Sequence, residues 1–312
     1  MRAPAYPCAH GCGAPAPEPT IDLVTQTGRP GQPSPGPSAP ASEPARPSPA
    51  PAEGHTRTGT YALDQEWPEE RRRLAGMQEL WDPGTKTVIE SLGIRPGWRC
   101  LEVGAGGGSI AAWLAERVGP GGEVLATDVS TRHLDALQLA NLEVREHDIL
   151  GDPLPDAHFD LVHARLVAEH LGRRSLERMV GPLRPGGWLV LEDCDWGAAC
   201  SYPDDRGQRA VDAANRLLSR SGLDPHYGRA LVHELTRAGL EDVSADGRVR
   251  VYRGGSLASG WMRLTLESLA AALVESGELT RQELELAWAD LDDPGSVFLS
   301  ASMIAARGRR PH

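Results

Sequence analysis

Short apolar runs alternate with amphipathic segments of helical period between residues 98 and 193. This alternation predicts right-handed crossovers between neighbouring strands, and hence an α/β fold with a doubly wound, mostly parallel sheet and helices on both faces. The near-continuous apolar character of the runs is typical of parallel strands buried on both faces. The predicted strands are 98–103, 124–129, 142–149, 159–165 and 188–193, and the predicted helices between them include 109–118 and 131–138.

The rest of the chain divides into further regions. Proline and alanine dominate residues 1–54, which bury too little apolar surface to offset the entropy of ordering, so we expect a disordered segment. Residues 55–95 predict a helical cap, with a break at Asp82-Pro83-Gly84. The remaining expected regions are a core domain at 96–255 that ends in a strand at 241–255, a helical insertion at 256–295, and a closing edge strand with a basic tail at 296–312, antiparallel to the strand before the insertion.

The charge and composition argue against several classes of partner. The 312 residues carry a formal net charge of −11 with only short basic runs, whereas nucleic-acid binders present a basic face to phosphates. Because no window approaches ~18 apolar residues and no signal-peptide core is visible, we expect no membrane partner and a cytoplasmic location. The five cysteines fit no disulfide framework, and Cys8, His10 and Cys12 lack a fourth ligand, so no metal is expected. A monomer and a homodimer both stay open.

Four glycines follow the first predicted strand, in the stretch LEVGAGGGSI. In open α/β sheets ligands bind beyond the carboxyl ends of the strands, and glycine lets a ligand approach the backbone. We therefore predict that Gly104, Ala105, Gly106 and Gly108 form a ligand-binding turn, although a tight turn with close helix packing would also use glycines. The residues from Gly106 onward fit the dinucleotide fingerprint as well, so the glycines alone leave two cofactor classes.

Three acids distinguish between these two classes. Glu102 stands directly before the glycines, where a dinucleotide would bring its anionic pyrophosphate, so its carboxylate favours a cationic amino acid head group instead. Asp128 ends the second predicted strand and is placed to accept hydrogen bonds from two ribose hydroxyls. Asp148, at the third strand, can accept from an exocyclic amine such as that of adenine. A nucleoside joined to an amino acid without phosphate describes S-adenosyl-L-methionine.

At these residues the chain resembles the class I S-adenosyl-L-methionine-dependent methyltransferases, of the small-molecule type. Glu102-Val-Gly104-Ala-Gly106-Gly-Gly108 is similar to the first motif of that family, FDLVHARLVAEHL to its strand-four motif, and LRPGGWLVLED to its turn into strand five. The resemblance covers roughly residues 96–255 and implies a seven-stranded sheet in the order 3-2-1-4-5-7-6, with strand seven antiparallel. It implies S-adenosyl-L-methionine as the cofactor, with contacts from Glu102, Gly104, Ala105, Gly106, Gly108, Asp128, Val129, His147, Asp148, Ile149 and Ala164.

The family also implies an acceptor pocket built from residues before the first strand and from the insertion between the last two. Those segments are 56–92 and 257–292 here. A general base matters only where the acceptor must lose a proton. The candidate catalytic residues are His163, His170 and Asp193, each with a helix-start or capping role as the alternative, and the candidate pocket residues are Tyr61, Trp67, Trp81, Arg165 and Trp196, each with core packing as the alternative.

The sequence therefore predicts an enzyme that transfers a methyl group to oxygen, nitrogen or carbon of a small molecule, with a role in secondary metabolism. The fourth strand continues as HARL and lacks the Asn/Asp-Pro-Pro-Tyr/Phe signature of base-amine methyltransferases, which agrees with the acidic charge. Two alternatives stay open. One is an NAD(P)-dependent oxidoreductase, and the other is a methyltransferase-like protein that binds the cofactor without transferring a methyl group.

Overall fold

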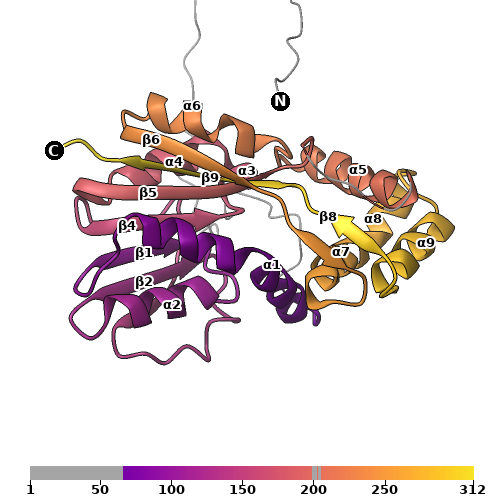
Figure 1. Cartoon of the computed structure of the whole chain (residues 1–312), viewed down its shortest axis with the longest axis horizontal. Helices are drawn as coiled ribbons and strands as arrows, with labels where there is room; N and C mark the ends of the chain where they lie inside the picture. The colour runs from indigo at the N-terminus through magenta and orange to yellow at the C-terminus, as the bar shows by residue number, and fades with distance from the viewer. Residues whose placement is uncertain (1–65, 199–201, 203–204) are drawn as a thin grey trace, which may run out of the picture. The chain divides into compact units, whose positions relative to one another are not determined.

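The computed structural model describes residues 66–198, 202 and 205–312 (Figure 1). The predictions made for residues 1–54 and for Tyr61 lie outside these residues. None of the helices in the described residues combines the length and the apolar character that a membrane span requires.

Seven strands form the main sheet, in the order β3-β2-β1-β4-β5-β9-β6. The first five strands along the chain pair in parallel, and β9 runs antiparallel to both β5 and β6. The structure thus confirms the predicted α/β fold, the strand order and the antiparallel last strand. The strands are β1 (Arg99–Val103), β2 (Glu123–Asp128), β3 (Leu142–Glu146), β4 (Phe159–Arg165), β5 (Leu183–Asp195), β6 (Glu241–Arg248) and β9 (Ser302–Arg309).

Neighbouring residues of the central strands point into different hydrophobic layers, as the two-residue period of a strand requires. Cys100 and Leu161 face a layer that contains α2 (Ser109–Val118) and the second half of α1 (Glu70–Ser91). Leu101 and Val162 face the opposite layer, which contains α4 (Arg173–Val180) and α6 (Leu231–Arg237). Helices on both faces bury the sheet, so its carboxyl-end edge is the place left for a ligand.

A third hydrophobic cluster lies beside the sheet and is mostly helical (Figure 1). It packs the first half of α1 against helices that follow β5 and helices inserted between β6 and β9. The helices between β6 and β9 lie within residues 257–292. The other elements of this part are α5 (Asp205–Arg220), β7 (Val251–Arg253), α7 (Leu257–Ser268), α8 (Ala270–Glu275), α9 (Arg281–Asp292) and β8 (Val297–Leu299), and α3 (Ala168–Leu171) and η1 (Tyr227–Ala230) complete the described chain.

The predicted helix break at Asp82-Pro83-Gly84 is wrong, because α1 runs through it without interruption. Proline inside a helix costs about 3 kcal/mol, since it lacks an N–H and its ring crowds the preceding turn. Tertiary contacts on both sides of the proline outweigh this cost. Trp81 and Thr85 are completely buried, and Asp82 binds the Arg165 guanidinium at 2.8 Å.

Two other segments differ from their predicted secondary structure. Residues 131–138 form successive turns, closed by bonds such as Leu134 N–H to Thr131 O at 2.8 Å, because so short a segment is a marginal helix. Each of the two late predicted strands is divided in two. Their outer parts, β7 and β8, pair with each other in a separate two-stranded sheet.

The close approach of α1 and α7 gives a stability prediction. A Cβ atom at Gly76 would lie 2.4 Å from the Leu257 carbonyl oxygen and 2.8 Å from the Trp261 backbone nitrogen. Gly76→Ala must therefore push α7 away, and we expect it to lower the free energy of unfolding by about 1–3 kcal/mol. In Gly260→Ala, on α7, the new Cβ meets no atom within 4 Å, so we expect a gain of about 0.4–1 kcal/mol. Urea unfolding followed by circular dichroism measures both, and effects of the same sign would contradict this packing.

Candidate functional site

One cavity of about 690 Å³ opens at the carboxyl ends of the parallel strands. Its wall includes residues directly after β1, β2 and β4 and residues from the loop that follows β3. Helices α1, α3, α5 and α7 supply much of the remaining wall, together with Trp196 after β5 and the turn after α5. The cavity therefore lies where the predicted topology expects a ligand, and it joins the sheet edge to the helical cluster.

The glycine turn forms one wall of the cavity. Gly104, Gly106 and Gly108 all have positive φ angles, at +68°, +54° and +79°, which non-glycine residues rarely adopt. Gly104 and Gly106 line the cavity, whereas Ala105 and Gly108 do not. A Cβ atom at Gly108 would lie 2.4 Å from the Leu137 side chain, so packing against the turns after β2 explains this third glycine.

Asp128 lies on the cavity wall against the glycine turn. Its Oδ2 accepts the Gly106 N–H at 2.8 Å, and its Oδ1 accepts the Ser130 N–H at 3.2 Å. The same carboxylate thus stabilises the turn and faces the cavity. Because Gly106 N–H already donates to Asp128, the turn has one backbone donor fewer for an anion. Val129 also lines the cavity.

The loop after β3 brings His147, Asp148 and Ile149 to the cavity. β3 ends at Glu146, so these residues belong to a turn in which Asp148 Oδ1 accepts the Leu150 N–H at 2.9 Å. Burial lowers the pKa of His147, which keeps its imidazole neutral at pH 7. Neither ring nitrogen of His147 has a hydrogen-bond partner in the described part of the chain. A buried ring with both nitrogens unpaired is a candidate for binding a polar ligand.

His133 shares this property and was not predicted from the sequence. Both of its ring nitrogens are buried and lack a partner among the described residues, and the ring lines the cavity beside Ser130. Glu146 is a second cavity residue that the sequence analysis did not single out. Two sequence signals could have identified these residues. His133 follows Asp128 closely along the chain, and Glu146 ends the strand that pairs with the strand of Asp128.

Glu102 does not lie where the sequence analysis expects it. It is buried and absent from the cavity wall, and its Oε2 lies 2.6 Å from His163 Nδ1. This pairing forms because β1 and β4 are neighbours and Glu102 is in register with His163. Near the glycine turn, the acidic residues that line the cavity, and whose carboxylates would repel a pyrophosphate, are Asp128, Glu146 and Asp148.

His163 is completely buried between two carboxylates, Glu102 and Glu192, whose Oε2 lies 3.4 Å from its Nε2. Burial lowers the pKa of His163, but the two carboxylates outweigh burial and raise it to about 9. The imidazole is therefore charged at pH 7. The expectation that His163 points toward an acceptor does not fit this position, because its ring nitrogens face buried acids and the cavity wall does not include it.

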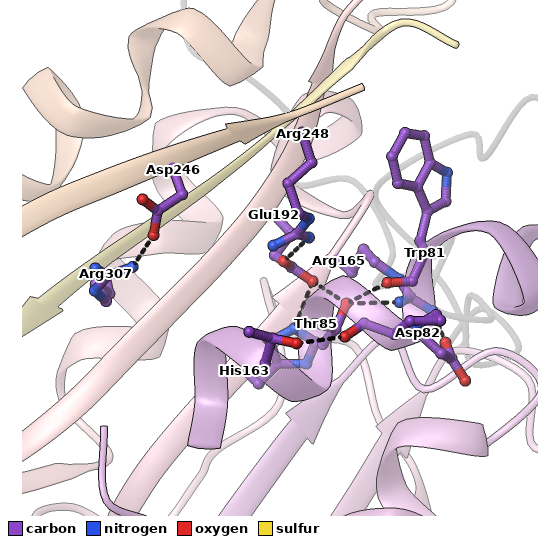
Figure 2. A network of polar contacts seen from close by, with 11 residues as sticks. Trp81, Asp82, Thr85, His163, Arg165, Glu192, Asp246, Arg248 and Arg307 are labelled. Atoms are coloured by element: carbon purple, nitrogen blue, oxygen red, sulfur yellow. Dashed lines mark hydrogen bonds and ion pairs between the residues drawn. The ribbon is translucent and has the colours of Figure 1, made fainter. Parts of the chain in front are cut away.

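Glu192 extends the network to two further elements (Figure 2). It accepts from the Thr85 hydroxyl of α1 and pairs with the Arg248 guanidinium at the end of β6. Although burial raises the pKa of Glu192, His163 and the arginines lower it to about 2. Arg165, which lines the cavity, donates to Thr85 Oγ1 and Asp82 Oδ1 at 2.8 Å each.

The other predicted site residues separate into two groups. His170 and Trp196 line the cavity, and the Trp196 ring lies 6.0 Å from that of Trp261, measured between centroids. The remaining residues are off the cavity wall. Asp193 is buried and accepts the Glu169 N–H at 3.2 Å, Trp81 is completely buried in the helical cluster, Trp67 is half-buried, and Ala164 belongs to the core.

The side chains of an apolar half of the cavity were not singled out from the sequence, although Met77, Trp261 and Met262 lie in the segments 56–92 and 257–292 that the family resemblance assigns to the acceptor pocket. This half is formed by side chains from several helices and the turn after β4, whose apolar faces look in the sequence like ordinary core positions. Leu166 lines this half of the cavity, and its own backbone has a positive φ of +57°. These side chains include Met77, Leu166, Val211, Leu218, Leu223, Trp261 and Met262.

The charged His163 predicts a pH dependence of stability. Its pKa is raised above the ordinary value of 6.5, so its stabilisation is complete below pH 6.5 and is lost as the pH rises through 9. We expect His163 to contribute a fall in the free energy of unfolding of roughly 1.4 kcal/mol per pH unit across this window. His163→Gln should lack this contribution and show a correspondingly smaller decline, and the exposed control His233→Gln should keep it. Denaturant unfolding at several pH values measures the slope; an equal decline in His163→Gln would refute the assignment.

Three comparisons with known proteins agree with this geometry. A family model for a methyltransferase domain matches residues 101–191. The chain is 35% identical over 138 residues to methyltransferase str2 of Strobilurus tenacellus, and the aligned region covers 43% of this chain and 50% of that protein. It is 30% identical over 164 residues to the ubiquinone/menaquinone biosynthesis C-methyltransferase UbiE of Laribacter hongkongensis (strain HLHK9). That aligned region covers 49% of this chain and 65% of that protein.

The fold has a solved counterpart from Bacillus halodurans C-125 that is provisionally named a methyltransferase. Its TM-score is 0.50 at 18% identity, over 73% of this chain and 98% of that one. The chain spans about half the length of the first curated relatives that it matches. The domain match and the strand order identify residues 101–191 as part of a methyltransferase domain of the class I S-adenosyl-L-methionine-dependent type.

Proposed function

We propose that the protein transfers a methyl group from S-adenosyl-L-methionine to oxygen, nitrogen or carbon of a small, mostly apolar molecule. One observation carries this proposal. A single cavity has carboxylates and unpaired imidazoles at the glycine turn, and apolar side chains at its helical side. A cofactor and an acceptor could therefore meet within one enclosed space.

The polar half fits the cofactor's chemistry. Asp128 would accept from the ribose hydroxyls, the loop of His147, Asp148 and Ile149 would hold the adenine, and Gly104 and Gly106 would let the amino acid end approach the backbone. The bound cofactor supplies a methyl group on a sulfonium, which leaves as a neutral sulfide and needs no proton. The chain's own contribution is then to align the reacting groups, which can be worth ~7–11 kcal/mol.

The apolar half favours an acceptor without a net charge. Arg73 bonds Glu70 through two contacts of 2.7 Å, and Arg165 is paired with Asp82, so both cavity arginines are neutralised by carboxylates. Most of the remaining wall is aliphatic or aromatic. An apolar body with few polar groups matches such a wall. A tailoring step in secondary metabolism would supply acceptors of this kind, and the name of the Laribacter relative also refers to a small-molecule pathway.

The cavity argues against the oxidoreductase alternative. A dinucleotide would place its pyrophosphate at the glycine turn, where Asp128 faces the cavity and already accepts the Gly106 N–H. Both the negative charge and the loss of a donor oppose an anion there. A protein that binds the cofactor without methyl transfer is the second alternative, and only an assay of the reaction separates it from the proposal.

A binding experiment and a transfer experiment together test the proposal. We expect calorimetry to show binding of S-adenosylhomocysteine and no comparable binding of NADH. Incubation with isotope-labelled S-adenosyl-L-methionine and metabolite extracts, followed by mass spectrometry, should show a labelled small-molecule product. Tight binding of NADH alone would overturn the proposal, and cofactor binding without any labelled product would favour the non-catalytic alternative.

Asp128 gives a sharper prediction. Asp128→Ala removes the two carboxylate oxygens that would accept hydrogen bonds from the ribose hydroxyls, and it also removes the partner of the Gly106 N–H. We expect the affinity for S-adenosylhomocysteine to fall by about 1.5–3 kcal/mol, or roughly 10–150-fold. Asp135→Ala, an exposed aspartate in the turns that follow, is the matched control and should bind like the wild type. Unchanged affinity in Asp128→Ala would remove Asp128 from the cofactor site.

A further inference from the structure

Two buried carboxyl groups, Glu169 at the cavity and Asp193 behind it, differ from most of the other buried acids. Most buried acids of the described chain have a basic partner, as Glu70 has Arg73, Glu102 has His163, and Glu192 has Arg248. Glu169 and Asp193 form no ion pair with an arginine or lysine within the described residues. Burying acids without a cation is costly, so their presence calls for an explanation other than stability.

Glu169 lines the cavity from α3, directly after the turn that follows β4. Its Oε2 accepts a long bond from the Cys194 N–H at 3.4 Å, and its Oε1 lies 3.7 Å from His170 Nε2. His170 lines the same wall. Asp193 stands behind Glu169 and accepts the Glu169 N–H, so it fixes the start of α3 and stays off the cavity wall.

The charged and titratable groups around Glu169 make it a poor acid and a useful base. Burial and the charge of Asp224, partly offset by the Cys194 N–H, raise the pKa of Glu169 to about 8. Burial and the charge of Arg73 lower the pKa of His170 to about 4, so His170 is neutral. The charged and titratable groups around Glu169 and Asp193 are Arg73 of α1, His170 of α3, Glu192 of β5, Asp224 before η1, and Tyr227 of η1.

We infer that Glu169 accepts a proton from the acceptor in the proposed methyl transfer, and that the acceptor is an apolar molecule whose methylated oxygen starts as the acidic hydroxyl of a phenol or an enol. The inference rests on the proposed function and assigns a catalytic residue and a substrate class to it. The wall around Glu169 supports the apolar body, since Leu166, Leu171, Trp196 and Leu223 share the cavity with it.

Methylation of a hydroxyl group requires the loss of its proton. The O–H bond breaks, its proton moves to the carboxylate of Glu169, and an oxygen electron pair forms the new bond to the methyl carbon. The carbon–sulfur bond breaks with its electrons staying on sulfur. An ordinary glutamate is ~6 pKa units below a phenol at ~10, whereas Glu169 is only ~2 below, so the transfer is far less uphill.

A matched pair of probes isolates the hydroxyl group. Full-length protein loaded with S-adenosylhomocysteine is titrated with 2-naphthol and with 2-methoxynaphthalene just above pH 8, where more than half of Glu169 is ionised. We expect 2-naphthol to bind roughly 10–150-fold more tightly, because only it donates a hydrogen bond to the carboxylate. In Glu169→Gln this preference should fall to within a few-fold, and in the exposed control Glu177→Gln on α4 it should persist.

An infrared titration gives a readout independent of any acceptor. We expect the band of protonated carboxyl groups to lose a component with a midpoint near pH 8 in the wild type and in Glu177→Gln, and this component to be missing in Glu169→Gln, where any band that remains belongs to Asp193, whose pKa burial also raises. Glu169→Asp keeps a carboxyl group and should retain a raised midpoint. This conservative variant, with the wild type, decides the titration if Glu169→Gln does not fold.

The outcomes separate the two proposals. Failure of S-adenosylhomocysteine to bind the wild type would overturn the proposed function itself. Normal cofactor binding with equal affinity for the two naphthalenes, with binding of neither, or with an unchanged preference in Glu169→Gln would overturn this inference alone. The same holds if no carboxyl band titrates above pH 6 in the wild type.

Discussion

The buried carboxylate of Glu192 is the contact on which the rest of this structure depends. It is completely shielded from solvent, and its partners come from three separate elements: Thr85 of α1, His163 of β4 and Arg248 of β6. Removing such a charge from water costs several kcal/mol unless its partners are all in place. The helix, the central strand and the edge strand must therefore assemble together around it, and the conformation of each is fixed by the same charge.

This dependence reaches the cavity through Arg165. Its guanidinium lines the cavity while it donates to Thr85 and Asp82 of α1, so the wall is held by the network behind it. The same contacts explain why α1 continues through Pro83. Gly84 belongs to the arrangement as well, because a Cβ there would lie 2.4 Å from the Arg248 Nε that passes across the helix. A segment that reads as a helix break is in fact the point where the helical cap is attached to the sheet.

The sequence could predict those features that follow from local pattern. The period of the apolar runs gives the parallel sheet, and the position of Asp128 and of His147 after their strands places them at the cavity. The partner of Glu102 could not be predicted, because His163 lies 61 residues away and the pairing depends on the register of β1 and β4. The apolar half of the cavity is hidden for a related reason. Met77, Leu218 and Met262 have the spacing of core residues, and only the packing of three helices decides which apolar faces border a space.

Buried acids that have a cationic partner can be distinguished in this protein from buried acids that have none. Glu70, Asp82, Glu102 and Glu192 each meet a cation; the pair of Glu70 lies within α1, and each of the other pairs joins one element to another. Glu169 and Asp193 are as deeply buried and have no such partner in the described chain, so they cost stability where the others offset their own burial. Asp193 fixes the start of α3 from behind the cavity wall, whereas core packing gives no reason for Glu169 to be buried there without a cation. The place of Glu169 at the cavity, beside a neutral His170, gives the proton-accepting role a physical basis that core packing lacks.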